Sequence, residues 1–274
     1  MTEKNLGNIG GLALVGAGKM GGAMLEGWLA LGLDPRRVSI FDPKPAPEIQ
    51  ALTAKGIVLN PASGEAGKPA VVVLAVKPQI APDAMPSVVP LVGSDTLVIS
   101  IMAGKTMKFL EAALPNAAIV RAMPNTPAAI GRGIAVLVPN ARVTAAQRQA
   151  ATDLLSATGK IEWVDDEGLI DAVTAVSGSG PAYVFHLAEA LAQAGIAAGL
   201  PKELAEKLAR ETVSGAGELL YRSPLDPATL RKNVTSPAGT TAAALEILMG
   251  PGGFDTLMTK AVAAAAKRSK ELAG

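Results

Sequence analysis

The chain contains no cysteine and only one histidine among its 274 residues. Disulfides, zinc–thiolate sites and cysteine nucleophiles are therefore excluded. Aromatic residues make up 3% of the chain and charged residues 18%, whereas hydrophobic residues make up 49%. The core is therefore expected to be aliphatic and rich in alanine. A chain this apolar is also expected to bury surface against another subunit.

Several classes of partner are not expected. A net charge of +1 provides no broad basic field, so nucleic acid is not a predicted partner. The sequence has no long uncharged apolar run for a membrane span and no apolar segment of a signal peptide near its first residue. Neither a paired-carboxylate motif nor a metal-ligand cluster stands out, so no metal is predicted. We expect a cytoplasmic protein.

A glycine-rich turn follows the first apolar run, Leu12–Val15. Gly16, Gly18 and Gly21 fit the pattern G-x-G-x-x-G. The first glycine permits a tight turn, the second leaves room for a pyrophosphate, and the third lets a helix pack against the strand. The helix predicted to begin at Lys19 would direct its first amides at phosphate oxygens. The segment predicts a dinucleotide site of the Rossmann type.

Two residues after the second predicted strand, Val38–Phe41, bear on the choice of cofactor. Asp42 lies at the spacing at which a carboxylate reaches the adenosine ribose, which favours NADH. Lys44 could bind a 2′-phosphate, which favours NADPH, or could be an ordinary solvated lysine. The sequence leaves both cofactors open.

Strands and helices alternate up to about Asp165, which predicts a parallel twisted sheet. Two loops at the carboxyl ends of predicted strands, Val76–Pro78 and Met123–Pro127, are placed where such sheets bind ligands. Residues 166–274 contain no convincing strand. We therefore predict an α/β protein, with a Rossmann domain over residues 1–165 and an all-helical substrate-binding and dimerisation domain over residues 166–274.

The predicted helical domain contains few groups for acid–base chemistry. A helix beginning at Pro181 is apolar nearly all round over Ala182–Ala198, so it is expected to be buried on several sides. His186 lies in this helix and is interpreted as a core or interface residue. Ser177–Tyr183 and Val234–Thr241 present hydroxyls and amides where helices begin, which suits a small carboxylate or, alternatively, simple N-capping.

These motifs together resemble those of the pyrroline-5-carboxylate reductase family. The matching segments span nearly the whole chain in the family's order and read GAGKMGGAM, LAVKPQ, MPNTP, DAVTAVSGSGPAYVF, GLPKELA and LRKNVTSPAGTTAAAL. Ala238 departs from the glycine usual in the family. The resemblance implies hydride transfer from NADPH or NADH to the imine carbon of pyrroline-5-carboxylate, giving L-proline.

The resemblance also implies roles for individual residues. Thr241 is the hydroxyl expected to contact the ring nitrogen and to serve catalysis. The substrate-binding residues expected are Glu167, Ser177, Ser179, Asn233, Gly239, Thr240 and Thr241. The cofactor-binding residues expected, including those of the glycine turn, are Gly16, Ala17, Gly18, Lys19, Met20, Gly21, Asp42, Lys44, Asn60, Ala75, Val76, Lys77, Pro78, Ile101, Met102, Ala103 and Asn125. A homodimer is implied, and a decamer of five dimers is left open.

Two other functions compete with this interpretation. A β-hydroxyacid dehydrogenase would need a general acid or base, and the related family uses a lysine on the long helix of the second domain. No lysine occurs between Lys160 and Lys202, which weighs against that enzyme. A non-catalytic dinucleotide sensor would not need a second anion site, and the two hydroxyl-rich motifs argue against it.

Overall fold

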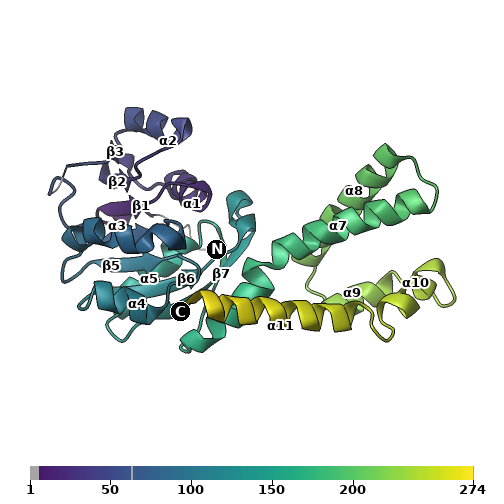
Figure 1. Ribbon diagram of the computed structural model, residues 1–274. Helices are drawn as coiled ribbons and strands as arrows, with labels where there is room; N and C mark the ends of the chain where they lie inside the picture. The colour runs from purple at the N-terminus through teal and green to yellow at the C-terminus, as the bar shows by residue number, and fades with distance from the viewer. Residues whose placement is uncertain (1–5, 63, 274) are drawn as a thin grey trace. The chain divides into compact units, whose positions relative to one another are not determined.

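The computed structural model describes residues 6–62 and 64–273 of the chain. Contacts divide the chain into two compact units. The first comprises residues 1–178 together with 266–274, and the second comprises residues 179–265. The first unit is a sheet covered by helices, and the second is built from helices (Figure 1).

The first unit contains one eight-stranded sheet in the order β3-β2-β1-β4-β5-β6-β7-β8. Its strands are β1 (Leu12–Val15), β2 (Val38–Phe41), β3 (Val58–Leu59), β4 (Val71–Leu74), β5 (Leu97–Ser100), β6 (Ala118–Met123), β7 (Gly133–Pro139) and β8 (Gly159–Trp163). The three central strands β1, β4 and β5 are buried along their whole length. Such continuous apolar runs are typical of parallel strands covered on both faces.

The predicted Rossmann-type sheet is confirmed, with one pairing that differs. All neighbouring strands pair in parallel except β6 and β7, which are antiparallel. The connection between them contains a short 3-10 helix, Thr126–Ile130, in place of a crossover helix. A parallel return needs a dozen or more connecting residues, so this short connection dictates the reversed direction.

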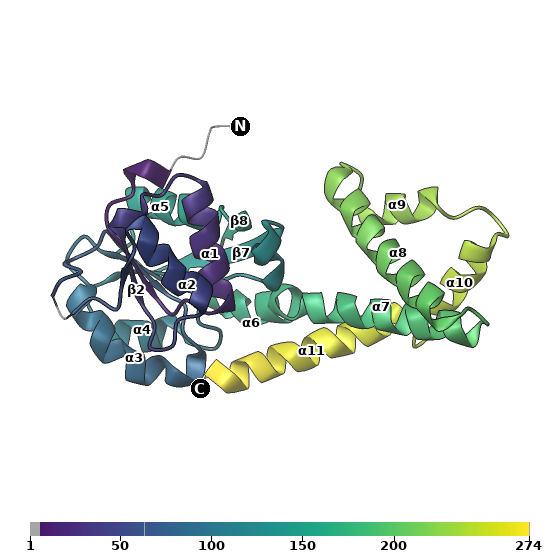
Figure 2. The same ribbon diagram turned by 90° about the horizontal axis from the view of Figure 1, so that it is seen from above.

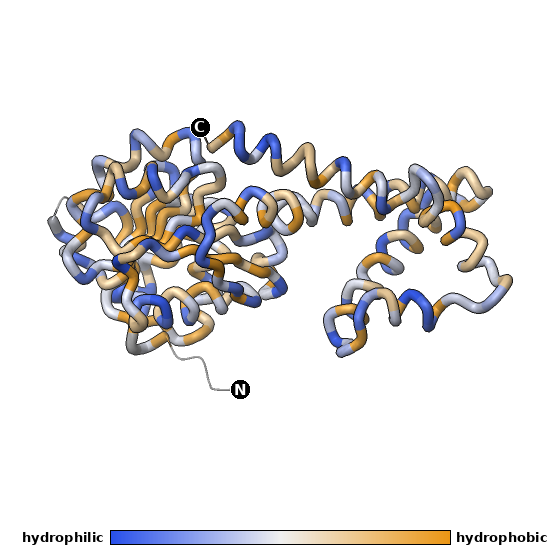
Figure 3. Tube along the Cα trace, turned by 90° about the horizontal axis from the view of Figure 1, so that it is seen from below, coloured by the Kyte–Doolittle hydropathy of each residue, from blue (hydrophilic) through white to orange (hydrophobic). Residues whose placement is uncertain are grey.

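Helices cover both faces of the sheet. One face carries α1 (Lys19–Ala30), α2 (Pro47–Ala51) and α5 (Ala145–Leu155), and the other carries α3 (Ala81–Val88) and α4 (Met107–Ala113) (Figure 2). The indole of Trp28 is fully buried and donates a 2.8 Å hydrogen bond to the carbonyl of Leu154, which joins α1 to α5. The strands form the most continuous hydrophobic band of the trace (Figure 3).

Short helical segments connect these elements. The 3-10 helices are Leu6–Asn8, Pro35–Arg37, Leu52–Lys55, Pro78–Ile80, Val89–Leu91, Thr126–Ile130 and Glu167–Leu169. The sequence predicts a helix over residues 48–55 and another, interrupted by proline, over residues 81–91. In both, the last turn is a 3-10 helix, Leu52–Lys55 and Val89–Leu91. In the second case Pro90 lacks the amide that a continuing helix would need. The helix α6 (Ile170–Val173) passes into a π-helix, Thr174–Gly178.

The second unit consists of α7 (Gly180–Ala197), α8 (Lys202–Arg222), α9 (Pro227–Asn233), α10 (Thr240–Leu248) and the beginning of α11 (Phe254–Ala273). Small residues allow α7 and α8 to approach closely, since a Cβ on Gly195 would lie 3.3 Å from that of Ala205. Asp226 caps α9, and hydrogen bonds from the hydroxyl and the amide of Thr229 hold its pKa below the ordinary value.

The prediction that α7 is buried on several sides is not met within a single chain. Phe185 is 65% exposed, and the side chain of His186 is 80% exposed. Within residues 179–265, α8 packs against α7, and Ala192 is the buried side chain of α7. Among the described residues, none of the helices has both the length and the apolar character needed to cross a membrane.

Candidate active site

A cleft of about 590 Å³ opens in the first unit at the carboxyl ends of four parallel strands, β1, β4, β5 and β6. The strand order reverses between β1 and β4, and ligands of open α/β sheets bind at such a switch point. The lining residues are Gly18, Lys19, Met20, Ala75, Val76, Lys77, Pro78, Ile101, Met102, Ala103, Met123, Pro124, Asn125, Thr126 and Gly178.

The surroundings of the three glycines in the first turn differ, so each position has its own reason to lack a side chain. Gly16 has a φ of +91°, and a Cβ there would lie 2.9 Å from the main chain of Ala75. A Cβ on Gly21 would lie 2.3 Å from the carbonyl oxygen of Gly16. A Cβ on Gly18 would meet no atom within 4 Å, so the protein itself leaves space at this point of the cleft. The turn and packing predictions for these residues are confirmed.

The beginning of α1 suits an anion. Its N-cap residue is Gly18, and no side chain of the N-cap accepts a hydrogen bond from the first turn. By contrast, Thr106 and Thr144 cap α4 and α5 with their hydroxyls. First-turn amides left without such a cap, at the positive end of the helix dipole, favour a phosphate.

Asp42 forms a hydrogen-bonded cluster where β2 ends. Its carboxylate accepts hydrogen bonds from the amides of Ala17 and Lys44, both at 2.9 Å. The side chain of Asn60 pairs with the amide and the carbonyl of Asp42, each at 2.8 Å. These four predicted cofactor-binding residues do not line the cleft. Asp42 is instead fixed against the glycine turn, and its remaining lone pairs are available to a hydroxyl.

Asn125 joins the cleft to the start of the helical part of the chain. Its side-chain amide donates to the hydroxyl of Ser177 at 3.2 Å, and its carbonyl oxygen accepts from the amide of Ile134 at 3.0 Å. Ser177 belongs to the π-helix that ends at Gly178, and such segments are frequent at functional sites. A Cβ on Gly178 would lie 2.6 Å from the Cε of Met123.

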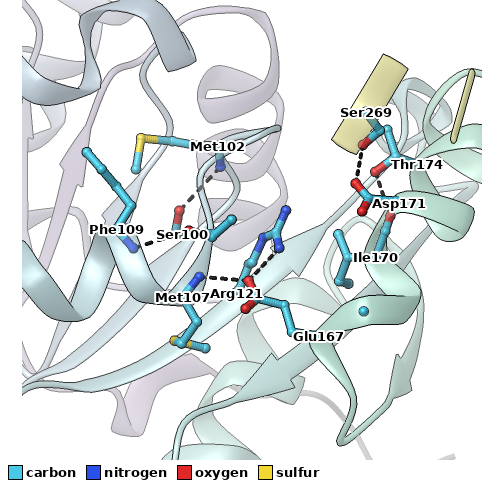
Figure 4. Close-up of polar contacts among 12 residues, drawn as sticks. Ser100, Met102, Met107, Phe109, Arg121, Glu167, Ile170, Asp171, Thr174 and Ser269 are labelled. Carbon is cyan, nitrogen blue, oxygen red and sulfur yellow. Dashed lines mark hydrogen bonds and ion pairs between the residues drawn. The ribbon is translucent and has the colours of Figure 1, made fainter. Parts of the chain in front are cut away.

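Glu167 is engaged within the protein. The same carboxylate oxygen accepts hydrogen bonds from the guanidinium of Arg121 and from the amide of Met107, the latter at 2.7 Å (Figure 4). Arg121 is 5% exposed and belongs to β6. Glu167 does not line the cleft, so its expected contact with substrate stays a prediction.

The remaining predicted substrate residues lie in the second unit. Ser179 precedes α7, Asn233 ends α9, and Gly239 is the N-cap of α10. Thr240 and Thr241 form the first turn of α10, where the N-cap again provides no side-chain hydrogen bond. Ala238 has a φ of +56°, so the turn keeps a left-handed conformation although alanine replaces the glycine usual in the family.

Four lining residues were not among the predicted cofactor-binding residues: Met123, Pro124, Thr126 and Gly178. The first three belong to the MPNTP turn, which the sequence singled out through its place after a strand. The signal is therefore present in the sequence, and the polar residues of this turn, Asn125 and Thr126, are the ones suited to lie beside a nicotinamide. Gly178 was assigned to a possible substrate motif, and the π-helix that brings it to the cleft leaves no mark in the sequence.

The fold and the cleft define the class: a Rossmann-type dinucleotide-binding oxidoreductase with a separate helical domain. The profile described as "NADP oxidoreductase coenzyme F420-dependent" matches residues 11–104. The profile described as "Pyrroline-5-carboxylate reductase dimerisation" matches residues 167–272, and the helical part is accordingly a self-association domain.

Named relatives are similar along nearly the whole chain. The pyrroline-5-carboxylate reductase of Pseudomonas aeruginosa is 42% identical, covering 96% of both chains, and that of Synechocystis is 40% identical, covering 95% of this chain and 97% of the relative. A Coxiella burnetii structure of this name is 35% identical with a TM-score of 0.89, covering 97% of this chain and all of the other. A Plasmodium falciparum structure with NADP bound is 30% identical with a TM-score of 0.81, covering 97% and 99%. The chain belongs to the pyrroline-5-carboxylate reductase family.

Proposed function

We propose that the chain catalyses the NAD(P)H-dependent reduction of 1-pyrroline-5-carboxylate to L-proline, the last step of proline biosynthesis. Family membership supports this reaction. The observation that carries it furthest is the cleft at the carboxyl ends of the strands, with Gly18 open towards it and α1 beginning without a side-chain cap.

The residues present fit a nicotinamide dinucleotide. The first-turn amides of α1 would hold the pyrophosphate, beside the ammonium group of Lys19. Val76–Pro78, Ile101–Ala103 and Asn125 would line the rest of the cofactor. When bound, the reduced cofactor supplies a hydride.

The choice between NADH and NADPH depends on the end of β2. Asp42 is fixed by two amides and carries a negative charge there, which favours a ribose hydroxyl over a phosphate. The exposed Lys44 is the adjacent group that could bind a phosphate. NADP is bound in the Plasmodium falciparum relative. The activity assay therefore has to compare NADH with NADPH.

The substrate carboxylate is assigned to the first turn of α10. Gly239, Thr240 and Thr241 offer amides and hydroxyls at the positive end of a nine-residue helix. Thr241 would orient the ring nitrogen through its hydroxyl. Asn233 and Glu167 join this set by their match to the family motifs. Ser177 and Ser179 join it because they present hydroxyls near the beginning of a helix.

The scarcity of acids and bases near these motifs agrees with the proposed chemistry. An imine protonated by solvent before binding is already an electrophile. Its carbon accepts a hydride, the C=N bond becomes C–N, and the proton stays on nitrogen to give the secondary amine. The protein has mainly to orient the ring, and positioning of this kind contributes several kcal/mol of barrier lowering.

The assembly and the location of the chain belong to the same proposal. We infer a homodimer formed by the helical domain, with a decamer of five dimers as the larger assembly, and the cytoplasm as the compartment. The domain boundary is placed near residues 165–166. The dimerisation profile, which begins at residue 167, supports this position, whereas contacts group residues 167–178 with the first unit.

The experiment is an absorbance assay at the nicotinamide band with pyrroline-5-carboxylate and each reduced cofactor in turn. Oxidation that depends on the substrate and yields proline is expected with at least one cofactor. Absence of oxidation with both, by protein that binds either cofactor, would exclude this substrate.

A further inference from the structure

The loop between β5 and α4 forms one wall of the cleft. Ile101, Met102 and Ala103 line it directly. The amide of Ile101 anchors the start of the loop by a 3.0 Å hydrogen bond to the carbonyl of Leu74 in β4. Beyond Ile101 the contacts are longer: the amide of Met102 lies 3.4 Å from the hydroxyl of Ser100, and the amide of Lys105 donates to the carbonyl of Met102 at 3.3 Å. Hydrogen bonds of 3.3–3.4 Å are weak, so residues 102–105 depend on packing as well, and Met102 is buried in the core at one end of this stretch.

The last turn of α11 packs against this loop. Gly104 has a φ of +71°, and a Cβ there would lie 3.3 Å from the carbonyl oxygen of Leu272 and 3.6 Å from its carbonyl carbon. Any other residue at this position would be strained and would also press on the main chain of α11. The cofactor loop and the end of α11 therefore lie against each other at Gly104 and Leu272, with little room for a side chain between them.

One turn earlier, α11 is fastened to α6. Ser269 is 7% exposed, and its hydroxyl donates a 2.6 Å hydrogen bond to a carboxylate oxygen of Asp171 (Figure 4). Ser269 and Leu272 are three residues apart, so they lie on one side of the helix. A short hydrogen bond to a charged acceptor is stronger than one between neutral groups. This bond therefore fixes the part of α11 that touches Gly104.

We propose that Ser269 is a positioning residue for the cofactor cleft. By fastening the end of α11 to Asp171, it holds Leu272 against Gly104 and keeps Ile101–Ala103 in the conformation that binds the cofactor. The inference rests on the proposed function, because it assumes that the cleft binds a nicotinamide dinucleotide.

The test compares Ser269→Ala with Ser87→Ala in the full-length protein. Ser87 lies on α3, is exposed and donates only to Ala84 of its own helix, so its replacement is the matched control. The dissociation constant of NADPH and of NADH is measured by fluorescence titration, and the KM for cofactor is measured beside kcat. Asp171→Asn, which keeps an acceptor oxygen, serves as the conservative variant.

We expect Ser269→Ala to raise the cofactor dissociation constant and KM about two- to tenfold, the effect of one hydrogen bond, with kcat at saturating cofactor unchanged. Asp171→Asn keeps an acceptor for the hydroxyl of Ser269, so its cofactor affinity should stay close to that of the wild type. Ser87→Ala should bind the cofactor as tightly as the wild type. A Ser269→Ala protein with a lowered Tm and wild-type cofactor affinity would overturn the inference. Should that variant fail to fold, Gly104→Ala tests the same contact from the loop side by the same readout. Wild-type protein that binds neither cofactor would instead contradict the proposed function.

Discussion

The two units differ in how far their large apolar side chains are buried. In the first, β1, β4 and β5 are buried along their whole length between two layers of helices. In the second, the apolar side chains of residues 179–265 that are buried are all alanines: Ala192, Ala205 and Ala209. Larger apolar side chains of α7, such as Phe185 and Leu191, remain exposed. A hydrophobic sequence can therefore mean a finished core or a surface that awaits a partner. The dimerisation profile over residues 167–272 indicates self-association of this part of the chain.

The largest expected effect is loss of assembly on Phe185→Asp. A carboxylate on α7 would have to be desolvated in the interface, and in a two-fold assembly the change occurs on both sides. We expect light scattering to report monomer or aggregate, with activity lost. Val89→Asp, at an apolar position 49% exposed in the first unit, should leave assembly intact. Unchanged size and activity of the Phe185 variant would show that α7 is not the associating surface.

Within the first unit, two glycines should respond differently. Gly18→Val is expected to weaken cofactor binding by about 100-fold or more with an unchanged Tm, because the side chain would occupy the space proposed for the ligand and its Cβ meets no protein atom within 4 Å. Gly21→Val should lower the Tm itself, since its Cβ collides with Gly16. Titration calorimetry measures cofactor affinity, and thermal unfolding measures the Tm of each variant. An equal loss of Tm in Gly18→Val and Gly21→Val would show that the two glycines do not have different roles.

Thr241→Ala is expected to lower kcat about tenfold, as for one lost orienting hydrogen bond, without abolishing turnover. Thr229→Ala, on α9 of the same unit, is a comparison variant whose side chain bonds only to Asp226 among the described contacts. Steady-state kinetics of the two variants measure this difference in kcat. An inert Thr241→Ala protein that still binds cofactor would make the hydroxyl an essential acid.

The smallest effect is expected at Ala238, which is held at a φ of +56°. Glycine relieves the left-handed strain, and we expect Ala238→Gly to raise the Tm by about 1–3 °C, because relief of strain outweighs the added freedom of the unfolded chain. Ala238→Val should lower the Tm. If Ala238→Gly is instead less stable than the wild type, the turn is not strained.

Much of the first unit could be predicted from sequence because its signals are local. Runs such as Val71–Leu74 mark buried strands, and glycine spacing marks the turn between β1 and α1. The direction of β7 could not be predicted, since it depends on pairing with β6 and on a connection too short to cross over. The helices of the second unit were recognisable, but whether α7 is covered depends on another subunit.

Part of the candidate site could also be predicted from the sequence, and part could not. Loops at strand ends were found because topology brings every parallel strand's carboxyl end to one edge. Contacts between distant residues were not found: Asp42 with Ala17, Glu167 with Arg121, and Ser269 with Asp171. Each joins residues on different elements, and neither partner carries a sequence pattern that names the other.

The most direct test of the central claim uses cofactor carrying deuterium at the transferred position of the nicotinamide. Mass spectrometry and NMR of the product should show one deuterium per proline, on the ring carbon that was the imine carbon. Proline formed without deuterium, or with deuterium at another carbon, would contradict direct hydride transfer to the imine.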